Sequence, residues 1–406
     1  MSLLVHKYGG TSVGSIERIE AVADRIVATR NLGHQVVVVV SAMSGETNRL
    51  TALAHEITDV PSPREMDVLL ASGEQVSIAL LVMALQKRGV DAQSFLGDQI
   101  PFKTDNGHER ARIEYVESKN LMCVVERGAV PVVAGFQGVD DVGDITTIGR
   151  GGSDTSAVAV AHAVEAAECL IYTDVDGVYT ADPRIVDKAT KMANVEFEEM
   201  LEMASLGAKV LHTRAVEFAH KHDVPMRVLS SFEDGEGTLI NSGADHMEKP
   251  LVSAVTHERD EAKLTVLRVD DVPGIAWKIL GPIGAANITV DMIVQNTSVD
   301  GFTDFSFTVK RADFVRAKDL LEASLKENGF SECELAGDDA IAKVTIVGVG
   351  MRSHAGVATK MFETLANENI NIMMISTSEI KISVVIEERY VELAVRSLHD
   401  AFALDQ

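Results

Sequence analysis

A glycine turn near the start of the chain combines a lysine, two glycines and two hydroxyl groups. The segment Lys7 to Ser12 (Lys-Tyr-Gly-Gly-Thr-Ser) follows an apolar run and precedes a helix expected from about Ile16. Amides in a Gly-Gly turn approach a phosphate closely, and the start of a helix favours an anion. The lysine precedes the glycines, so this is not a Walker motif. The pattern predicts a phosphate site, with an ordinary strand-to-helix turn as the alternative.

A second glycine loop places a guanidinium and a carboxylate four residues apart. The segment Gly149 to Thr155 contains Arg150 and Asp154 among glycines, and it also opens a predicted helix. Arg150 can hold a carboxylate through two parallel hydrogen bonds, while Asp154 can face an ammonium group. The pair predicts a site for a zwitterionic ligand. The alternatives are a solvated loop arginine and an acidic residue in the first turn of a helix.

Two shorter segments add polar groups at the ends of predicted elements. Ser41 to Gly45 closes a valine-rich strand with small and hydroxylated residues, and Thr47 follows in the loop. Glu74 stands at the predicted start of a long apolar helix over 73–87. At that position it either contacts a ligand or complements the helix dipole.

The segment from Tyr172 to Arg184 leaves a predicted strand and turns sharply. Its acidic residues, aromatic rings and arginine would suit the ribose, base and phosphates of a nucleotide. Its Asp-x-Asp-Gly sequence also occurs in calcium loops. The calcium interpretation is weak, because Ile185 occupies the position of the last glutamate of an EF-hand loop that begins at Asp174.

Strands and helices that alternate along roughly the first 240 residues must position these segments. Short apolar or β-branched runs predict strands, and apolar residues at helical spacing or runs of good helix formers predict helices. The alternation predicts an α/β fold, a three-layer αβα domain with a mostly parallel sheet, whose ligands bind beyond the carboxyl ends of the strands. The predicted strands are 3–7, 36–41, 130–134, 169–174 and 226–229, and the helices are 16–29, 73–87 and 153–167.

The chain after residue 250 repeats itself with a period of 82 residues. Gly274 and Gly356 have this spacing (356 − 274), as do Asn287 and Asn369 (369 − 287), and an isoleucine follows each asparagine. The shared order of strands and helices predicts two ferredoxin-like (βαββαβ) modules. We place a catalytic domain at 1–240, a linker at 241–250, and modules at 251–336 and 337–406, with the strand near 251–257 available to either module.

Composition restricts the class of protein. Hydrophobic residues form 46% of the 406, which excludes disorder and suffices for two or three domains. The net charge of −24 disfavours nucleic-acid and membrane-surface partners. Three widely spaced cysteines predict neither a disulfide framework nor a thiolate metal site and suit a reducing cytoplasm. The most apolar run, 36–40, is too short to span a membrane, and no signal peptide is evident, so we expect a cytoplasmic protein.

Taken in order, these segments resemble the aspartokinases of the amino-acid kinase family. The similar segments are 7–12, 41–44, 72–75, 149–155, 172–184 and 207–211, and the repeats resemble that family's paired ACT regulatory modules; 103–126 is the least similar stretch. The resemblance implies transfer of the γ-phosphoryl group of ATP, with Mg²⁺ and no organic cofactor, to the side-chain carboxylate of L-aspartate. The product, 4-phospho-L-aspartate, begins the pathway to lysine, threonine and methionine.

The resemblance also implies roles for individual residues. Lys7 would bridge the phosphate and the acceptor carboxylate, and Arg150 would hold the α-carboxylate of the substrate. Glu74 and Asp154 would hold the substrate's ammonium group. Ser41, Thr47 and Ser153 would complete this pocket. The implied ATP contacts are Lys7, Gly9, Gly10, Thr11, Ser12, Thr173, Asp174, Tyr179, Arg184, Lys209 and Val210, with Lys7, Asp154 and Lys209 as catalytic residues; metal ligands are not assigned.

For the repeats, the resemblance implies an effector site for lysine, threonine or both. Asp271 would take the ammonium group of the effector and Gln295 its polar side chain or carboxylate; a turn before Pro273 and a surface strand end are the alternatives. The implied effector residues are Asp271, Gly274, Ile275, Ala276, Gln295, Asn371 and Ile372. A homo-oligomer formed through the ACT modules is implied, and Met247 would allow a separately made regulatory chain.

The implied reaction needs little proton chemistry. An aspartate side chain, with a pKa of about 3.9, is already ionised at neutral pH, so no general base is required. Positive charge must instead bring an anionic nucleophile to a polyanionic donor. Two alternatives stay open: a kinase of another carboxylate, such as glutamate or acetylglutamate, and an amino-acid sensor whose kinase half is vestigial.

Overall fold

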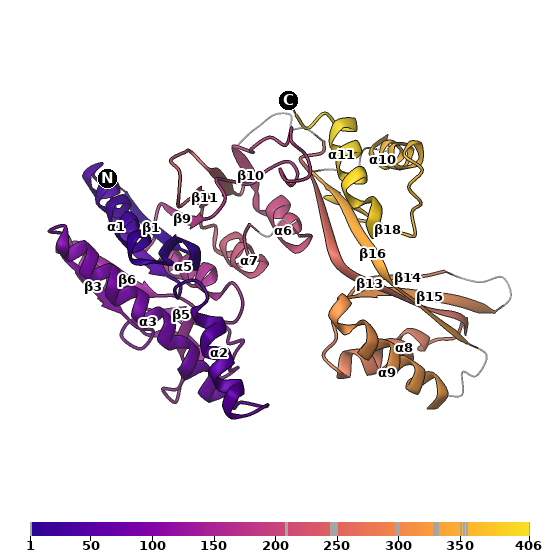
Figure 1. The fold of residues 1–406 in the computed structure, drawn as a ribbon, viewed down its shortest axis with the longest axis horizontal. Helices are drawn as coiled ribbons and strands as arrows, with labels where there is room; N and C mark the ends of the chain where they lie inside the picture. Colours follow the sequence, from indigo (N-terminus) through magenta and orange to yellow (C-terminus); the bar gives the residue numbers. More distant parts are fainter. Residues whose placement is uncertain are drawn as a thin grey trace. The chain divides into compact units, whose positions relative to one another are not determined.

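The computed structural model describes residues 2–207, 210–243, 251–296, 301–327, 333–349, 351, 354 and 356–405. The chain forms two compact units (Figure 1). Unit 1 comprises Met1–Tyr179 and Lys191–Glu248, and unit 2 comprises Thr180–Thr190 and Lys249–Gln406. The sequence analysis did not anticipate that Thr180–Thr190 would pack with unit 2. There Ala181 and Val186 join a hydrophobic core, and the Val255 N–H donates to the Thr180 carbonyl (2.8 Å).

Unit 1 is built on an eight-stranded sheet in the order β10-β12-β11-β9-β1-β2-β6-β3. Every pairing is parallel except that of β11 with β12. The predicted α/β fold with a mostly parallel sheet is therefore confirmed. The strands are β1 (Leu3–Tyr8), β2 (Gln35–Val40), β3 (Ala92–Phe95), β6 (Val130–Ala134), β9 (Glu168–Thr173), β10 (Asn194–Glu196), β11 (Met226–Ser230) and β12 (Thr238–Asn241).

Helices cover both faces of this sheet, as the all-valine strand β2 requires. Val36, Val38 and Val40 pack into a core with α1 and α3, while α5 packs against β1, β2 and β9. Burial on both faces explains why β2 is a continuous apolar run and not an alternating one. The helices are α1 (Ile16–Asn31), α2 (Glu46–Ile57), α3 (Pro63–Lys87), α4 (Lys119–Glu126), α5 (Gly152–Ala163), α6 (Phe197–Ser205) and α7 (Thr213–His222).

Helix α3 differs from the sequence prediction, because it begins at Pro63 and not at Gly73. Proline is favoured in the first turn of a helix, where its missing N–H has no partner to lose. Within the described residues α3 alone has the length and hydropathy of a membrane span, but Ile78, Leu81 and Leu85 lie in the core of unit 1. Glu74 is therefore in the helix interior, and the interpretation that it complements the dipole at the helix start was wrong.

Unit 1 also contains a smaller four-stranded sheet, which the sequence analysis did not predict. Its order is β5-β4-β7-β8, and β8 packs against α3. The segment 105–112 connects β4 to β5 within this sheet, and the segment 148–151 connects β8 to α5. The strands are β4 (Phe102–Thr104), β5 (Ile113–Val116), β7 (Gln137–Val139) and β8 (Ile145–Thr147).

Unit 2 contains one antiparallel sheet in the order β14-β15-β13-β16-β18-β17. Its long central strands, β13 (Ala254–Asp270) and β16 (Glu334–Val347), belong to both modules. The first half of β13 pairs with the second half of β16 in the module of α10 and α11, and the remaining halves pair in the module of α8 and α9. The other elements are α8 (Ile275–Ala285), β14 (Val290–Gln295), β15 (Phe302–Val309), α9 (Phe314–Glu327), α10 (Gly356–Asn367), β17 (Met374–Thr377), β18 (Lys381–Glu387) and α11 (Val391–Ala401).

The 82-residue repeat is confirmed at the two asparagines. Asn287 and Asn369 follow α8 and α10 with left-handed backbones (φ 57° and 56°). The N–H groups of the isoleucines that follow, Ile288 and Ile370, donate to the Ile283 and Leu365 carbonyls (3.1 and 2.9 Å). Asparagine tolerates this backbone conformation at a helix end better than most residues do.

Candidate active site

The candidate site lies at the carboxyl ends of neighbouring strands in unit 1. The Gly9 N–H donates to the Tyr172 carbonyl (3.3 Å), the Ser41 N–H to the Tyr8 carbonyl (3.0 Å), and the Gly135 N–H to the Val40 carbonyl (3.0 Å). These bonds align the loops after β9, β1, β2 and β6. The chain continues from β1 to β2 on one side, and it later returns as β9 on the other side of β1. Open α/β sheets bind ligands at such a topological switch point.

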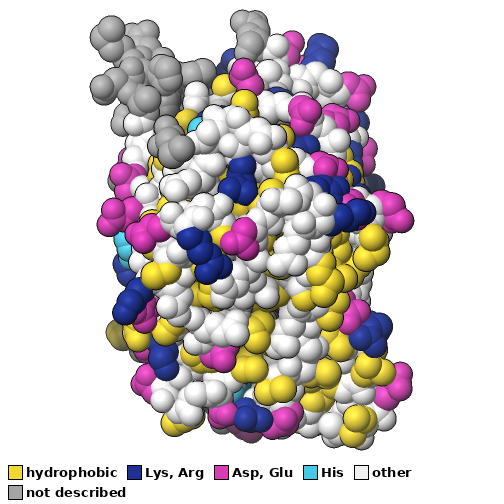
Figure 2. Space-filling model, turned by 90° about the vertical axis from the view of Figure 1, so that its left-hand side faces the viewer, with side chains coloured by type: hydrophobic (Ala, Val, Ile, Leu, Met, Phe, Trp, Pro, Cys, Tyr) yellow, Lys and Arg dark blue, Asp and Glu magenta, His cyan; other side chains and the backbone are white. Residues whose placement is uncertain are grey.

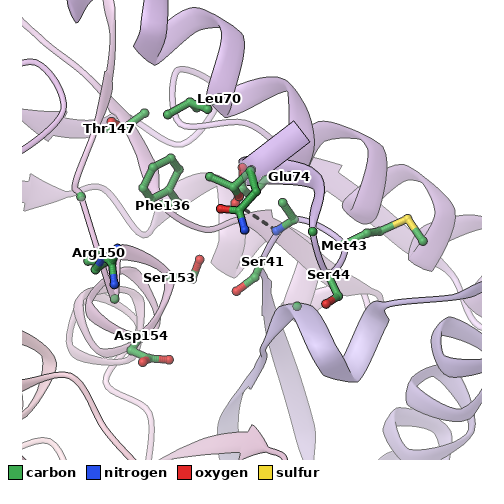
Figure 3. Close-up of a pocket in the computed structure, with 18 of the residues that line it drawn as sticks. Ser41, Met43, Ser44, Leu70, Glu74, Phe136, Thr147, Arg150, Ser153 and Asp154 are labelled. Atoms are coloured by element: carbon green, nitrogen blue, oxygen red, sulfur yellow. Dashed lines mark hydrogen bonds between the residues drawn. The ribbon is translucent and has the colours of Figure 1, made fainter. Parts of the chain in front are cut away.

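A cavity of about 510 Å³ opens among these loops. Figure 3 shows Arg150 on one side and Glu74 and Ser41 on the other, with Ser153 between them. The structure thus brings together residues that the sequence analysis took from four separate segments. The predicted residues that line the cavity are Lys7, Gly10, Ser41, Thr47, Glu74, Arg150, Ser153 and Asp154.

Lys7 and Asp154 form an ion pair in this cavity. Lys7 is at the end of β1 and is 8% exposed, and its Nζ lies 2.5 Å from Oδ1 of Asp154 in the first turn of α5. In this structure Asp154 holds the ammonium group of Lys7 at the N-terminal end of α5.

Glu74 presents a buried carboxylate to the cavity. The residue is 3% exposed, and its Oε1 accepts a hydrogen bond from the Ala42 N–H (3.0 Å). Its Oε2 has no hydrogen-bond partner within the part of the chain that the structure describes. Burial raises the pKa of the Glu74 carboxyl to about 7. Gly73 permits the close approach of α3 to this loop, because a Cβ there would lie 2.9 Å from the Ala42 Cβ.

The loop that carries Arg150 turns through two left-handed glycines. Gly149 has φ 86° and Gly151 has φ 69°, and Gly151 caps α5. The first N–H groups of an α-helix have no partner within the helix and favour anions. Ser153 and Asp154, both in the first turn of α5, line the same cavity as Arg150, so a guanidinium and a helix N-terminus face it together.

The predicted nucleotide residues fall into two groups. Thr173 ends β9 and Asp174 follows it, next to Tyr172, whose carbonyl accepts from the Gly9 N–H. The Thr173 hydroxyl donates to Asp174 (3.1 Å). The Tyr179 hydroxyl donates to Asp176 (2.9 Å). Gly10 lines the cavity and Thr11 is exposed, but Ser12 is fully buried and its hydroxyl donates to the Tyr172 carbonyl (3.4 Å). The Ser12 hydroxyl is therefore not presented to a phosphate as predicted.

No described contact brings the remaining predicted ATP-binding residues to the carboxyl ends of the strands in unit 1. Arg184 belongs to unit 2, where its exposed guanidinium pairs with Asp182 (2.7 Å). Val210 is partly buried in unit 1, and Lys209 lies outside the described residues.

The predicted effector residues lie on separate turns of unit 2. Asp271, Gly274 and Ala276 belong to the connection from β13 into α8, and Gln295 ends β14; Asp271, Gly274 and Gln295 are exposed. Ile275 is 3% exposed and belongs to a hydrophobic core, so its side chain does not face a ligand in this structure. Asn371 and Ile372 precede β17 in the other module.

Sequence reasoning missed several residues that line the cavity. Leu70, Glu109, Phe136 and Thr147 lie there, and Glu109 and Phe136 have left-handed backbones (φ 64° and 67°). Leu70 is one helical turn before Glu74, so the two side chains lie on the same face of α3. The sequence analysis could not use this spacing, because it began the helix at Gly73 and not at Pro63. The other three are in or beside the small sheet, and no sequence motif marked them.

Comparison with known proteins agrees with this geometry. Residues 2–230 match the amino acid kinase family, and residues 263–325 and 344–402 match ACT domains. The chain is 60% identical to an aspartate kinase of Stutzerimonas stutzeri over 406 residues, which cover all of this chain and 98% of that protein.

Two solved structures of E. coli aspartokinase III are similar over the whole chain. One, in complex with aspartate and ADP (R-state), has a TM-score of 0.80 at 28% identity and covers 98% of this chain and 99% of that chain. The other, with lysine and aspartate (T-state), has a TM-score of 0.79 at 28% identity with the same coverage. The chain therefore belongs to the amino acid kinase family and, within it, to the aspartate kinases that carry two ACT domains.

Proposed function

We propose that the cavity of unit 1 binds L-aspartate and the γ-phosphate of ATP, and that the protein transfers this phosphoryl group to the side-chain carboxylate of aspartate. The observation that carries the proposal is the buried Lys7–Asp154 pair at the N-terminus of α5, in the same cavity as Arg150 and Glu74. The product is 4-phospho-L-aspartate. E. coli aspartokinase III, which binds aspartate and ADP, is similar over nearly the whole chain.

Three groups orient the amino acid. Arg150 holds the α-carboxylate through paired hydrogen bonds. Glu74 accepts a hydrogen bond from the ammonium group through Oε2, which has no partner among the described residues. Asp154 contributes to ammonium binding only indirectly, because Lys7 occupies it. Ser41, Thr47 and Ser153 complete the pocket. With both ends of the amino acid held, its side-chain carboxylate is left to face Lys7 and the amides of α5.

Phosphoryl transfer at this site depends on charge and position. The attacking carboxylate is ionised, so no residue removes a proton from it. Lys7 and the amides of α5 offset the negative charge as the phosphoryl group moves between oxygens, and Mg²⁺ enters with ATP as part of that substrate. Lys209 is proposed to assist on the nucleotide side, together with Gly9, Gly10, Thr11, Thr173, Asp174, Tyr179 and Val210. No organic cofactor takes part.

Regulation is proposed to act through unit 2. Lysine, threonine or both bind at the residues assigned above, and the chains associate through their ACT modules, with a separately made regulatory chain as a possible partner. The E. coli structure with lysine and aspartate supports an amino-acid effector. We also propose a cytoplasmic protein without nucleic-acid or membrane partners, which the net charge of −24 favours. On the face shown in Figure 2, acidic and basic side chains are interspersed.

The substrate is tested by trapping the acyl phosphate with hydroxylamine while ADP release is followed. L-Aspartate should give both signals, and L-glutamate and N-acetyl-L-glutamate should give neither. N-Acetylglutamate has no ammonium group to satisfy Glu74, so its turnover would contradict the proposed orientation. ATP binding with no turnover of any of the three would identify a sensor.

Arg150→Lys tests which substrate the second glycine loop binds. An ammonium group cannot form two parallel bonds to a carboxylate, so the KM for aspartate should rise at least about tenfold while the KM for ATP stays nearly constant. A rise in the KM for ATP instead would assign the loop to the nucleotide.

A further inference from the structure

Two charged residues that do not line the cavity hold the loops that do. Asp67 is on α3 and Arg214 is in the first turn of α7, and neither belongs to a segment that suggested chemistry in the sequence. Both make hydrogen bonds to the connections at 108–111 and 147–151. The second connection contains Arg150.

Asp67 is fully buried, and both connections supply hydrogen-bond donors to its carboxylate. It accepts hydrogen bonds from the Thr147 hydroxyl (2.5 Å), the His108 Nδ1 (2.7 Å) and the Glu109 N–H (3.0 Å). A buried carboxylate is tolerated only when it is paired or hydrogen-bonded in this way. Asp67 therefore fixes Glu109 and Thr147, both of which line the cavity, to the same helix that presents Glu74.

Arg214 joins the same connections from the opposite side. Its guanidinium donates to the Ile148 carbonyl (2.7 Å) and to the Ala111 carbonyl (2.6 Å). The Ala111 N–H in turn donates to the Thr147 carbonyl (2.9 Å). The two connections are thus bonded to each other and to α7 as well as to α3.

The glycines on either side of Arg150 leave the loop dependent on these bonds. Glycine restricts its backbone least of all residues, so left-handed Gly149 and Gly151 do not by themselves determine where Arg150 points. Gly151 also packs directly on His212, just before α7, since a Cβ there would fall 2.1 Å from the His212 Cγ. The position of the Arg150 backbone is therefore determined by neighbours on α3 and α7.

We propose that Asp67 and Arg214 are positioning residues for aspartate binding, which hold the Arg150 loop at the distance from Glu74 that the amino acid requires. The inference rests on the proposed function, because it takes Arg150 as the group that binds the α-carboxylate. Neither residue touches the substrate or the phosphoryl group. Their loss should weaken aspartate binding and leave nucleotide binding intact.

The test is steady-state kinetics on the full chain with Asp67→Asn and Arg214→Lys. Because small misplacements of a substrate-binding group are costly, each variant should raise the KM for aspartate about tenfold. The KM for ATP, and kcat at saturating aspartate, should change by less than about twofold. In the double variant Asp67→Asn/Arg150→Lys the KM for aspartate should rise by less than the product of the two single increases, because both changes act on the contact between Arg150 and the α-carboxylate.

Matched variants separate positioning from general loss of stability. Glu168→Gln removes a carboxylate from another partly buried ion pair, 2.5 Å from Arg227 at the start of β9, and should leave the KM for aspartate unchanged. Thr147→Ser keeps the hydroxyl that donates to Asp67, so it should raise the KM for aspartate less than Thr147→Val does. Thr147→Val should reproduce the effect of Asp67→Asn, and it serves in place of that variant if Asp67→Asn does not fold.

The outcomes distinguish this inference from the function on which it rests. A folded Asp67→Asn or Thr147→Val with a normal KM for aspartate, beside a raised KM in Arg150→Lys, would overturn the positioning role alone. Equal changes in kcat and both KM values would also overturn it, as evidence of a purely structural role. An unchanged KM in Arg150→Lys would overturn the assignment of Arg150 and the inference together.

Discussion

The two units handle their functional residues differently. In unit 1, residues from separate segments meet in one cavity at the carboxyl ends of β1, β2 and β6. In unit 2, the predicted effector residues stay on turns of two modules, and Asp271, Gln295 and Asn371 are exposed. A parallel sheet brings the loops that follow its strands to a single edge, whereas antiparallel strands send their connections to both ends. Topology thus assembles the candidate site within one unit and leaves most of the predicted effector residues on separate segments.

The largest effect should come from Lys7→Ala, which removes the central charge of the unit 1 cavity. Its ammonium group matters most while the phosphoryl group is in transit, so kcat should fall by about 10²-fold or more, with a smaller change in the KM for aspartate. Steady-state kinetics measures both values, and unchanged thermal unfolding would show that the variant is folded. Near-normal turnover would remove Lys7 from the mechanism.

Glu74 should make aspartate binding depend on pH. The pKa of its carboxyl is raised to about 7, so the carboxyl is partly protonated near neutral pH. It must lose this proton before it can pair with the ammonium group of aspartate. The KM for aspartate should fall as the pH rises from about 6 to 8, and Glu74→Gln should have a higher KM without this dependence. Identical pH profiles for the variant and the parent would exclude Glu74 from aspartate binding.

The same raised pKa predicts how ligand-free stability changes with pH. The folded state binds a proton more tightly than the unfolded chain, so the stability that Glu74 contributes is complete below about pH 4.5 and is lost as the pH rises through about 7. At pH 8 Glu74→Gln should be more stable than the parent by as much as about 3 kcal/mol. Denaturant unfolding without ligands at pH 5 and 8 measures the difference.

Gln295→Ala tests whether the exposed turns of unit 2 bind an effector. An effector acts only through its different affinity for the active and inactive states, so the variant should keep uninhibited activity within about twofold and lose inhibition by lysine, threonine or both. Thr377→Ala, 82 residues later at the end of β17, is the matched control in the second module. If neither amino acid binds or inhibits the parent, the assignment of the effector site is wrong.

The smallest effects should come from the two equivalent asparagines of unit 2. Asn287→Ala and Asn369→Ala each place alanine at a left-handed backbone, which should lower the free energy of unfolding by about 1 kcal/mol. Asn287→Gly and Asn369→Gly should be close to neutral. Denaturant unfolding measures all four variants, and a response at only one of the two sites would contradict the equivalence of the modules.

The sequence by itself determined five strands of the main sheet and the tandem repeat, and it marked eight of the residues that line the cavity. Continuous apolar runs such as 36–40 identify strands buried on both faces, and glycines beside Lys7 and Arg150 mark turns that bring backbone to a ligand. These signals are local, because each depends on residues that are neighbours in the chain. For the same reason Glu74 was recognised as a site residue although the start of its helix was misplaced.

Only the tertiary structure decided which groups meet and what charge they carry. Asp154 pairs with Lys7, and Glu74 is buried against the Ala42 amide. Asp67 and Arg214 lie far along the chain from the Arg150 loop that they hold. Such contacts join distant segments, and the desolvation that raises the Glu74 pKa comes from packing around the whole side chain. No pattern of neighbouring residues encodes these distances or this burial.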